Sequence, residues 1–296
     1  MSILINENTR IIIQGITGRE GSFHTRQMLE YGTKITSGVT PGKGGQEIHG
    51  VPVYNTVREA AETRGADASL LFIPARFLAG GVFEAIDAGI PLIIMMAEYM
   101  PVHDMMLCYH MAKAKGSRLI GPNSFGIISP GKSKAGFMDH NIFTKGPVGI
   151  MSRSATNCYE TASMLTGRGI GQSTCIGVGG DMIPGTTFVD LLPHFENDPQ
   201  TEAIVIIGEI GGDDEEEAAA YIKKYVSKPV IALIVGKSAP QGEVMGHAGA
   251  ITGAGGKGGA DGKEKALRDA GCHVVQSTMH IADILVEILT GDYENR

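Results

Sequence analysis

One histidine stands in a setting that suits chemistry. His247 is the second residue of the sequence GHAGA, residues 246–250, and a glycine-rich run follows over residues 253–259. Glycine adopts many backbone conformations and has no side chain to pack around a ring. The loop therefore predicts an exposed, mobile imidazole, as a nucleophile that moves between two sites requires. An ordinary surface histidine in a flexible loop is the alternative interpretation.

A carboxylate is predicted to lie near this histidine. Glu209 follows an apolar segment, residues 203–207, that is typical of a buried strand, and it precedes two glycines. This places Glu209 at the carboxyl edge of a parallel sheet, where open α/β sheets bind ligands. A carboxylate there can hold one imidazole nitrogen and leave the other free to attack. We therefore predict a catalytic pair of His247 and Glu209, with a solvated loop glutamate as the alternative.

A second strand end carries hydroxyl groups. Residues 148–151 predict a strand and residues 156–166 a helix, and the turn between them reads Ser152-Arg153-Ser154-Ala155. The free N–H groups at the start of a helix bind anions. We predict a phosphate or substrate site at this turn. A simple helix cap by Ser154 is the alternative. The predicted site residues are Ser152, Ser154, Ala155 and Thr156.

The first part of the chain has a dinucleotide-type turn. Gly15, Gly18 and Gly21 follow an apolar segment and precede a predicted helix, so backbone N–H groups can approach a pyrophosphate. An NAD site would also need a carboxylate at the end of the next strand. That place is a glycine-rich loop with Lys43, which suits a phosphate instead. Coenzyme A and NADP both fit this pattern, and a structural turn without a ligand is the alternative.

Composition sets the broad class. The chain has 296 residues, of which 43% are hydrophobic and 19% charged, as in a globular protein of two domains. A net charge of −7 without a basic stripe argues against nucleic-acid binding. The apolar runs are too short for a membrane span. The four cysteines form no metal-binding or redox pair, so we expect reduced thiols, no metal site and a cytoplasmic location.

Apolar segments alternate with amphipathic ones, which is typical of α/β folds with parallel sheets. A segment rich in Gly, Pro and Ser, residues 121–146, is predicted to be a linker, with domains over residues 1–122 and 123–296. The other predicted strands cover residues 10–14, 34–39, 69–73, 91–96, 118–120, 173–178, 229–235 and 273–276. The other predicted helices cover residues 22–31, 77–88, 102–115, 187–196, 215–225, 263–270 and 279–289.

Taken together, these motifs resemble a known family. The chain is similar to the α subunits of succinyl-CoA synthetases, whose relatives include malate–CoA ligase and ATP-citrate lyase. The resemblance covers almost the whole chain. It rests on residues 15–18, 38–45, 121–123, 152–154, 179–181, 208–212 and 246–250. It implies a Rossmann-like CoA-binding domain followed by a flavodoxin-like parallel α/β domain.

The resemblance also implies roles for single residues. His247 would carry a phosphoryl group, Glu209 would orient it, and Tyr159 would lie near a small carboxylic acid substrate. The implied coenzyme A site comprises Gly15, Thr17, Gly18, Arg19, Glu20, Lys43, Met96, Ala97 and Glu98. An ATP-grasp β subunit would bind ATP or GTP with Mg²⁺, in an αβ or α2β2 assembly. The implied activity is an acid–CoA ligase that works through an acyl phosphate.

Some positions depart from the family pattern. Ser124 and Phe125 replace the usual Cys-Pro, Ala155 replaces a glycine, and the usual aliphatic-threonine strand end is Met95-Met96-Ala97. These changes surround the expected reacting centre, so succinate, malate and citrate all remain candidate acids. Two readings from other classes are an NADP-dependent reductase that uses the Gly15 turn and a non-catalytic CoA-binding regulator.

Overall fold

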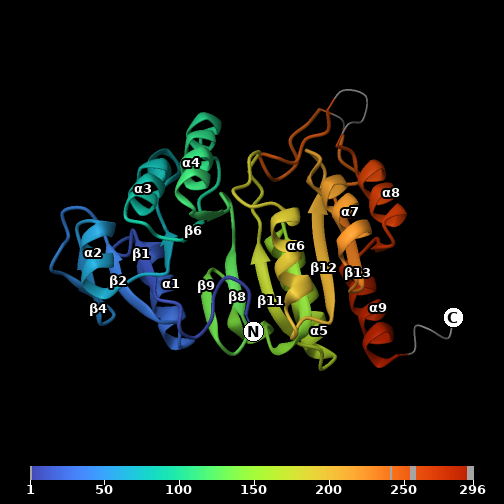
Figure 1. Cartoon of the computed structure of the whole chain (residues 1–296), viewed down its shortest axis with the longest axis horizontal. Coiled ribbons are helices and arrows are strands. Elements are labelled where there is room, and N and C mark those ends of the chain that lie inside the picture. The colour runs from blue at the N-terminus through green and yellow to red at the C-terminus, as the bar shows by residue number, and fades with distance from the viewer. Residues whose placement is uncertain (1, 241, 254–257, 292–296) are drawn as a thin grey trace.

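The chain forms two α/β units side by side (Figure 1). The computed structural model describes residues 2–240, 242–253 and 258–291. Each unit is built on a seven-stranded sheet that is mostly parallel. The alternation of apolar and amphipathic segments therefore predicted the fold class correctly. No helix in the described part of the chain is long and apolar enough to cross a membrane.

The first sheet has the order β3-β4-β2-β1-β5-β6-β7. Apart from β3, its strands follow the Rossmann order, which reverses between β1 and β5, and a ligand crevice is expected there at the carboxyl ends. The strands are β1 (Ile11–Gln14), β2 (Ile35–Val39), β3 (Glu47–Ile48), β4 (Val51–Tyr54), β5 (Ala68–Leu71), β6 (Leu92–Met95) and β7 (Arg118–Ile120). The helices are α1 (Arg19–Glu30), α2 (Val57–Arg64), α3 (Ala75–Asp87) and α4 (Val102–Lys115).

The second sheet has the order β14-β13-β12-β10-β11-β8-β9, and its parallel part has the flavodoxin order. The strands are β8 (Gly126–Ser129), β9 (Ser133–Gly136), β10 (Lys145–Ser152), β11 (Gln172–Gly177), β12 (Ala203–Glu209), β13 (Val230–Val235) and β14 (His273–Val275). The helices are α5 (Ala155–Gly167), α6 (Phe188–Asn197), α7 (Asp214–Tyr225), α8 (Ala260–Asp269) and α9 (Thr278–Thr290), with a short 3₁₀ turn at His140–Ile142.

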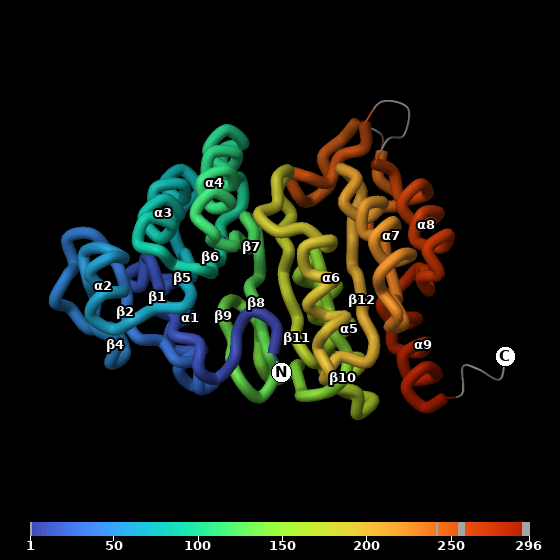
Figure 2. The backbone as a smooth tube through the Cα atoms, viewed as in Figure 1, coloured from blue at the N-terminus to red at the C-terminus, as the bar shows by residue number. Residues whose placement is uncertain are grey.

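Helices cover both faces of each sheet, so the central strands are apolar on both sides. In the second unit α5 and α9 pack on one face, while α6, α7 and α8 pack on the other. In the first unit α2, α3 and α4 share a face. Helix α1 covers the opposite face and also contacts β9 of the second unit. The tube view shows β8 and β9 at the side of the second unit that faces the first unit (Figure 2).

The predicted linker was wrong. Residues 121–146 contain the antiparallel hairpin of β8 and β9, which extends the second sheet through β11. The predicted domain boundary after residue 122 falls between β7 and β8. The amino terminus, however, crosses to the second unit. The Ile3 N–H donates to Thr174 Oγ1 at 3.4 Å, and the Ser129 hydroxyl donates to the Ile5 carbonyl at 3.0 Å.

Helix α1 also differs from its prediction. It begins at Arg19 rather than at residue 22, so Arg19 and Glu20 belong to its first turn and not to the preceding loop. The turn proper ends at Gly18, which is the N-cap. The first turn of a helix presents its free N–H groups, so this shift brings them closer to the glycine turn.

Candidate active site

His247 and Glu209 lie in direct contact. His247 Nδ1 is 2.7 Å from Glu209 Oε2, and Glu209 is the last residue of β12. The imidazole is 29% exposed and Glu209 is 7% exposed. The ring is therefore less exposed than the sequence predicted, because the loop folds back onto the sheet edge. The contact occupies Nδ1 and leaves Nε2 as the nitrogen available for attack.

The neighbouring loop supplies the wall behind this ring. A Cβ at Gly180 would lie 2.5 Å from His247 Cγ and Nδ1, so only glycine leaves room for the imidazole. The Gly249 N–H donates to the Gly180 carbonyl at 3.0 Å, and the Ala250 N–H donates to the His247 carbonyl at 3.0 Å. These bonds hold residues 247–250 in a tight turn. Part of the following glycine run, residues 254–257, lies outside the described residues.

Charges around the imidazole favour its protonated form. The hydrogen bond to Glu209 is the main cause that raises the pKa of His247, and Glu98 acts in the same direction. Partial burial and the charge of Arg153 oppose them. Arg153 itself is buried, with Nη1 3.6 Å from Glu209 Oε1. Arg153 lies within the predicted phosphate turn, but the sequence pattern indicated no role for its side chain.

Asp181 joins the two units beside this pair. Its carboxylate accepts from the Tyr99 N–H at 3.3 Å and the Met100 N–H at 3.0 Å, in the segment after β6. Burial raises the pKa of Asp181, and the charge of Glu98 adds to this. The predicted coenzyme A residues at 96–98 are thus held close to the histidine loop. The motif Gly179-Gly180-Asp181 signalled this loop, but it could not show which segment the aspartate would bind.

The predicted phosphate turn is largely occupied by its own side chains. The Ser152 hydroxyl is buried, accepts from the Ser154 N–H at 3.0 Å and donates to the Ser154 carbonyl. Ser154 Oγ accepts from the Asn157 N–H at 3.3 Å and caps α5. Ala155 and Thr156 form the first turn of α5, with Thr156 exposed. The capping interpretation of Ser154 is therefore correct, and it does not exclude a phosphate at the other N–H groups.

Tyr159 lies on α5 in an aromatic cluster. Its ring meets Phe125 and Phe143 edge to face, with centroids 5.6 and 6.0 Å apart. Burial raises the pKa of Tyr159, so its hydroxyl stays protonated near neutral pH. Phe125 is one of the departures from the family pattern, and here it packs directly against the tyrosine predicted to lie near the acid.

The residues predicted to bind coenzyme A gather at the carboxyl edge of the first sheet. Gly15 has φ +78°, and a Cβ there would lie 2.4 Å from the Phe72 carbonyl oxygen. The Thr17 hydroxyl donates to Thr40 Oγ1 at 3.1 Å, which ties this turn to the loop of Lys43. Within the described residues no side chain caps α1. Its N–H groups and the exposed Lys43 are therefore arranged to receive an anionic ligand.

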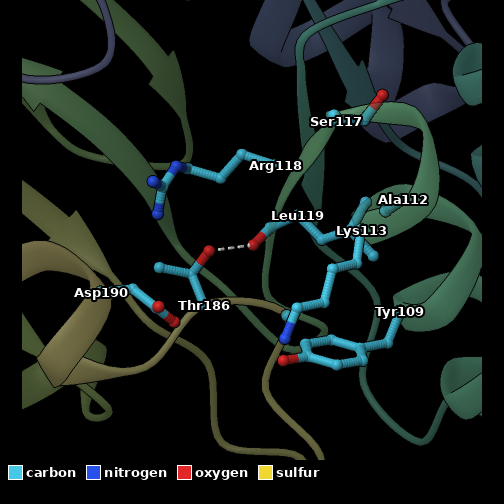
Figure 3. Close-up of a pocket in the computed structure, with 10 residues that line it drawn as sticks. Tyr109, Ala112, Lys113, Ser117, Arg118, Leu119, Thr186 and Asp190 are labelled. Carbon is cyan, nitrogen blue, oxygen red and sulfur yellow. Dashed lines mark hydrogen bonds between the residues drawn. The ribbon is translucent and has the colours of Figure 1, made fainter.

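A separate cavity lies between the end of α4 and the loop before α6 (Figure 3). Its volume is about 310 Å³, and it is formed by the end of α4, by β7 and by the loop before α6. None of the predicted site residues line it. A smaller cavity of about 230 Å³ lies beside the histidine loop and is lined by Tyr99, Asp181 and Ala248 among others. None of the predicted site residues lines this second cavity either, although Ala248 follows His247 directly. The described residues hold no cluster of three potential metal ligands.

Comparison with known proteins agrees with both halves of this arrangement. Residues 6–99 match the family of CoA-binding domains, and residues 151–273 match the CoA-ligase family. The fold and the two matches define a CoA-dependent ligase chain. The CoA-binding match also favours coenzyme A over NADP at the Gly15 turn.

Curated proteins with similar sequences narrow this class. The chain is 51% identical to the α subunit of ADP-forming succinate–CoA ligase from Aquifex aeolicus, over 98% of the chain and 95% of that protein. It is 54% identical to the corresponding subunit from Methanothermobacter thermautotrophicus, over 95% of each. The chain belongs to the family of the α subunits of ADP-forming succinate–CoA ligases, which are acid–thiol ligases. The resemblance inferred from the motifs is thereby confirmed.

A solved structure with the same fold extends the comparison. ATP citrate lyase from Methanothrix soehngenii, in complex with citrate and coenzyme A, superposes with a TM-score of 0.85 at 24% identity. The match covers 96% of this chain and 51% of that one. This likeness shows that the two-domain fold is shared.

Proposed function

We propose that the chain is the α subunit of an ADP-forming succinate–CoA ligase in which His247 carries the phosphoryl group. The relatives described above are named for this activity. The observation that carries the proposal is the contact of 2.7 Å between His247 Nδ1 and Glu209 Oε2. It fixes the tautomer and orientation of the imidazole and leaves Nε2 as the nucleophile.

The proposed reaction proceeds in three steps, which are two phosphoryl transfers and one acyl transfer. Nε2 of neutral His247 attacks the terminal phosphoryl group of ATP and releases ADP. A succinate carboxylate oxygen then takes the phosphoryl group and forms succinyl phosphate, and His247 becomes neutral again. The thiolate of coenzyme A attacks the acyl carbon and displaces inorganic phosphate. Such transfers depend mostly on positioning and charge stabilisation. Glu209 stabilises positive charge on the imidazole while the bond between His247 Nε2 and phosphorus forms.

The nucleotide belongs to a partner subunit in this proposal. We infer an ATP-grasp β subunit that holds ATP and Mg²⁺, in an αβ or α2β2 assembly. The turn of residues 247–250 then has to leave the Gly180 wall to reach the nucleotide. The glycines on both sides of His247 allow that movement. The first domain contributes the coenzyme A site with the glycine turn, the Lys43 loop and residues 96–98.

Several acids have to be compared, because Phe125 and Ala155 differ from the family pattern close to Tyr159. Succinate is the proposed substrate, since the curated relatives described above are named for it. Malate and citrate are the alternatives that the altered positions suggest. A ligation screen with the assembled enzyme, each acid, ATP and coenzyme A decides between them.

Labelling tests the central step. The assembled enzyme is incubated with ATP that carries a labelled terminal phosphate, and the acid-labile, alkali-stable label on the chain is located by proteolysis. We expect label at His247 in the native enzyme and none in His247→Asn, with thioester formation lost as well. The matched control is His49→Asn, which changes an exposed histidine of the first domain. Normal labelling and turnover of His247→Asn would refute the proposal.

A further inference from the structure

A buried ion-pair network lies behind the Glu209–His247 pair. Lys263 on α8 and Glu215 on α7 are both fully buried, and their charged groups are in direct contact. Lys263 Nζ also lies 3.1 Å from Glu216 Oε2. Burying a charge costs free energy unless a partner compensates it. Two charged side chains in a protein core therefore call for an explanation beyond packing.

Glu215 reaches the backbone that carries the catalytic carboxylate. Its Oε1 accepts a hydrogen bond from the Glu209 N–H at 3.0 Å. A Cβ at Gly208 would lie 2.5 Å from the same oxygen, so only glycine at this position of β12 leaves room for the Glu215 carboxylate. The position of Glu209 on β12 is thus fixed by a side chain from a neighbouring helix.

Arg153 connects Glu215 to the carboxylate of Glu209. Its Nη1 is 3.6 Å from Glu209 Oε1, and its Nε is 3.8 Å from Glu215 Oε1. A third carboxylate, Asp214, binds Nη2 directly. Within the described structure Glu209 Oε1 and Arg153 Nε are buried without a hydrogen bond. The guanidinium therefore interacts with several carboxylates at once. When its interaction with one of them weakens, its interaction with another can strengthen.

We propose that Glu215 and Lys263 are positioning residues that set the protonation of His247 by dividing the charge of Arg153 between Glu215 and Glu209. The proposal rests on the proposed function, since it concerns the histidine of that site. Lys263 partly neutralises Glu215, and this limits how strongly Glu215 attracts Arg153. Arg153 in turn limits how strongly Glu209 favours the imidazolium. Lys263 lies on α8, the helix that follows the histidine loop. The packing of α8 against α7 therefore places Lys263 beside Glu215.

The two residues should act with opposite sign. The charged groups that face His247 are Glu209, Glu98, Asp181 and Arg153. Without the charge of Glu215, Arg153 acts more fully on Glu209, and the neutral imidazole is favoured. Without the charge of Lys263, Glu215 attracts Arg153 more strongly, and the imidazolium is favoured. A role in packing alone would give no such opposition.

Titration of His247 tests this directly. The full chain is prepared with isotope-labelled histidine, and the His247 ring signal is assigned by its loss in His247→Asn. We expect Glu215→Gln to lower the midpoint by about half a pH unit and Lys263→Met to raise it by a similar amount. The double variant should titrate within about 0.2 pH unit of Glu215→Gln, because Lys263 acts on Arg153 only through the charge of Glu215.

A milder variant covers the case in which the single core variants do not fold. Glu216 contacts Lys263 but is 34% exposed, so Glu216→Gln keeps the core intact. In this variant Lys263 neutralises Glu215 more fully, so Arg153 acts more strongly on Glu209. The titration midpoint of His247 should therefore fall. Glu217→Gln, at the neighbouring exposed position, is the matched control for a direct charge effect. Unchanged midpoints, or shifts of one sign in Glu215→Gln and Lys263→Met, would overturn the proposal, as would equal shifts in the Glu216 and Glu217 variants.

The titration is independent of turnover. If the native assembled enzyme never labels His247 while the opposed shifts are present, the proposed function fails and the network stands. If His247 is labelled but the variants titrate alike, the network fails and the function stands. In the assembled enzyme with labelled ATP, phosphorylation of His247 is lost below a certain pH, which we call the acid limit. The same variants should shift this acid limit by the same amounts and in the same directions as the titration midpoint.

Discussion

The two units use the same strand–turn–helix device in opposite ways. The turn between β1 and α1 is built from glycines, and it leaves the start of α1 uncapped by any described side chain. The turn between β10 and α5 is filled by Ser152, Arg153 and Ser154, and Ser154 caps the helix. The first turn reaches the surface at Gly18 and offers backbone N–H groups. The second is buried and holds a guanidinium among carboxylates.

In the proposed function this difference separates binding from chemistry. A glycine turn before an uncapped helix can accept a large anionic ligand, because the N–H groups of the helix start remain free and the backbone can approach closely. A turn filled with compensated charges acts on its neighbours instead, since charges in a low-dielectric site act strongly on one another. Variants of the second turn's network should therefore change the pH dependence of the reaction, whereas variants of the first turn should change affinity for coenzyme A.

The largest expected effect concerns Glu209. In Glu209→Gln, phosphorylation of His247 should slow by about 100-fold or more, because the imidazole loses the carboxylate that orients and stabilises it. Its acid limit should also fall. Glu209 is the main cause that raises the pKa of His247, and only the neutral ring attacks phosphorus. In the native enzyme, labelling is therefore lost as the pH falls through a value above the ordinary 6.5, and the variant should label to lower pH.

The measurement is the rate of label transfer from ATP across pH, with Glu217→Gln as the matched control. Glu217 is an exposed carboxylate in the first turn of α7, so its variant should follow the native profile. A Glu209→Gln enzyme with the native rate and acid limit would remove the distinction between the two turns.

The next effect concerns the glycine turn. A Cβ at Gly21 would lie 2.2 Å from the Gly15 carbonyl oxygen, so Gly21→Ala forces α1 away from the turn. We expect the dissociation constant of coenzyme A to rise at least about tenfold and the free energy of unfolding to fall by about 1–3 kcal/mol. The pH profile of His247 labelling should keep its shape. Calorimetric titration with coenzyme A and thermal unfolding measure both quantities.

Gly80→Ala is the control for this prediction. Gly80 lies inside α3, and a Cβ there meets nothing within 4 Å, so alanine should leave coenzyme A binding unchanged and raise stability slightly. Equal losses of affinity in both variants would show that the close approach at Gly21 is not what shapes the coenzyme A site.

The sequence predicted the contact between His247 and Glu209 better than the surroundings of that pair. His247 and Glu209 could be paired because one lies in a glycine loop and the other ends a strand. The walls of the site could not be predicted, since Gly180 meets His247 only through the folded loop. Buried charges were missed for a physical reason. Residues 213–217 look like a solvated helix start, yet Glu215 in that run is fully buried against Lys263.

Glycine-rich composition also concealed strands of the fold from sequence-based prediction. Residues 121–146 looked like a linker because their strands are short and interrupted by Gly and Pro, although β8 and β9 complete the second sheet. Between residues 40 and 68 no helix or strand was predicted, although β3, β4 and α2 lie there. Long, strongly apolar strands such as β12 and β13 gave clear signals. Short edge strands depend on pairing with distant segments, which local patterns do not reveal.

The smallest expected effect concerns Lys43. Its side chain is exposed on the loop that Thr17 and Thr40 tie to the glycine turn. Lys43→Met should weaken coenzyme A binding by about three- to tenfold at low ionic strength, and the difference should shrink as salt screens the charge. Lys34→Met is the matched control, because that exposed lysine precedes the opposite end of the same strand, β2. A loss of affinity that salt does not reduce would argue against a charge contact. A change in the acid limit of His247 labelling would show that the two turns are electrically coupled, and the division between a binding turn and a chemical turn would then have to be given up.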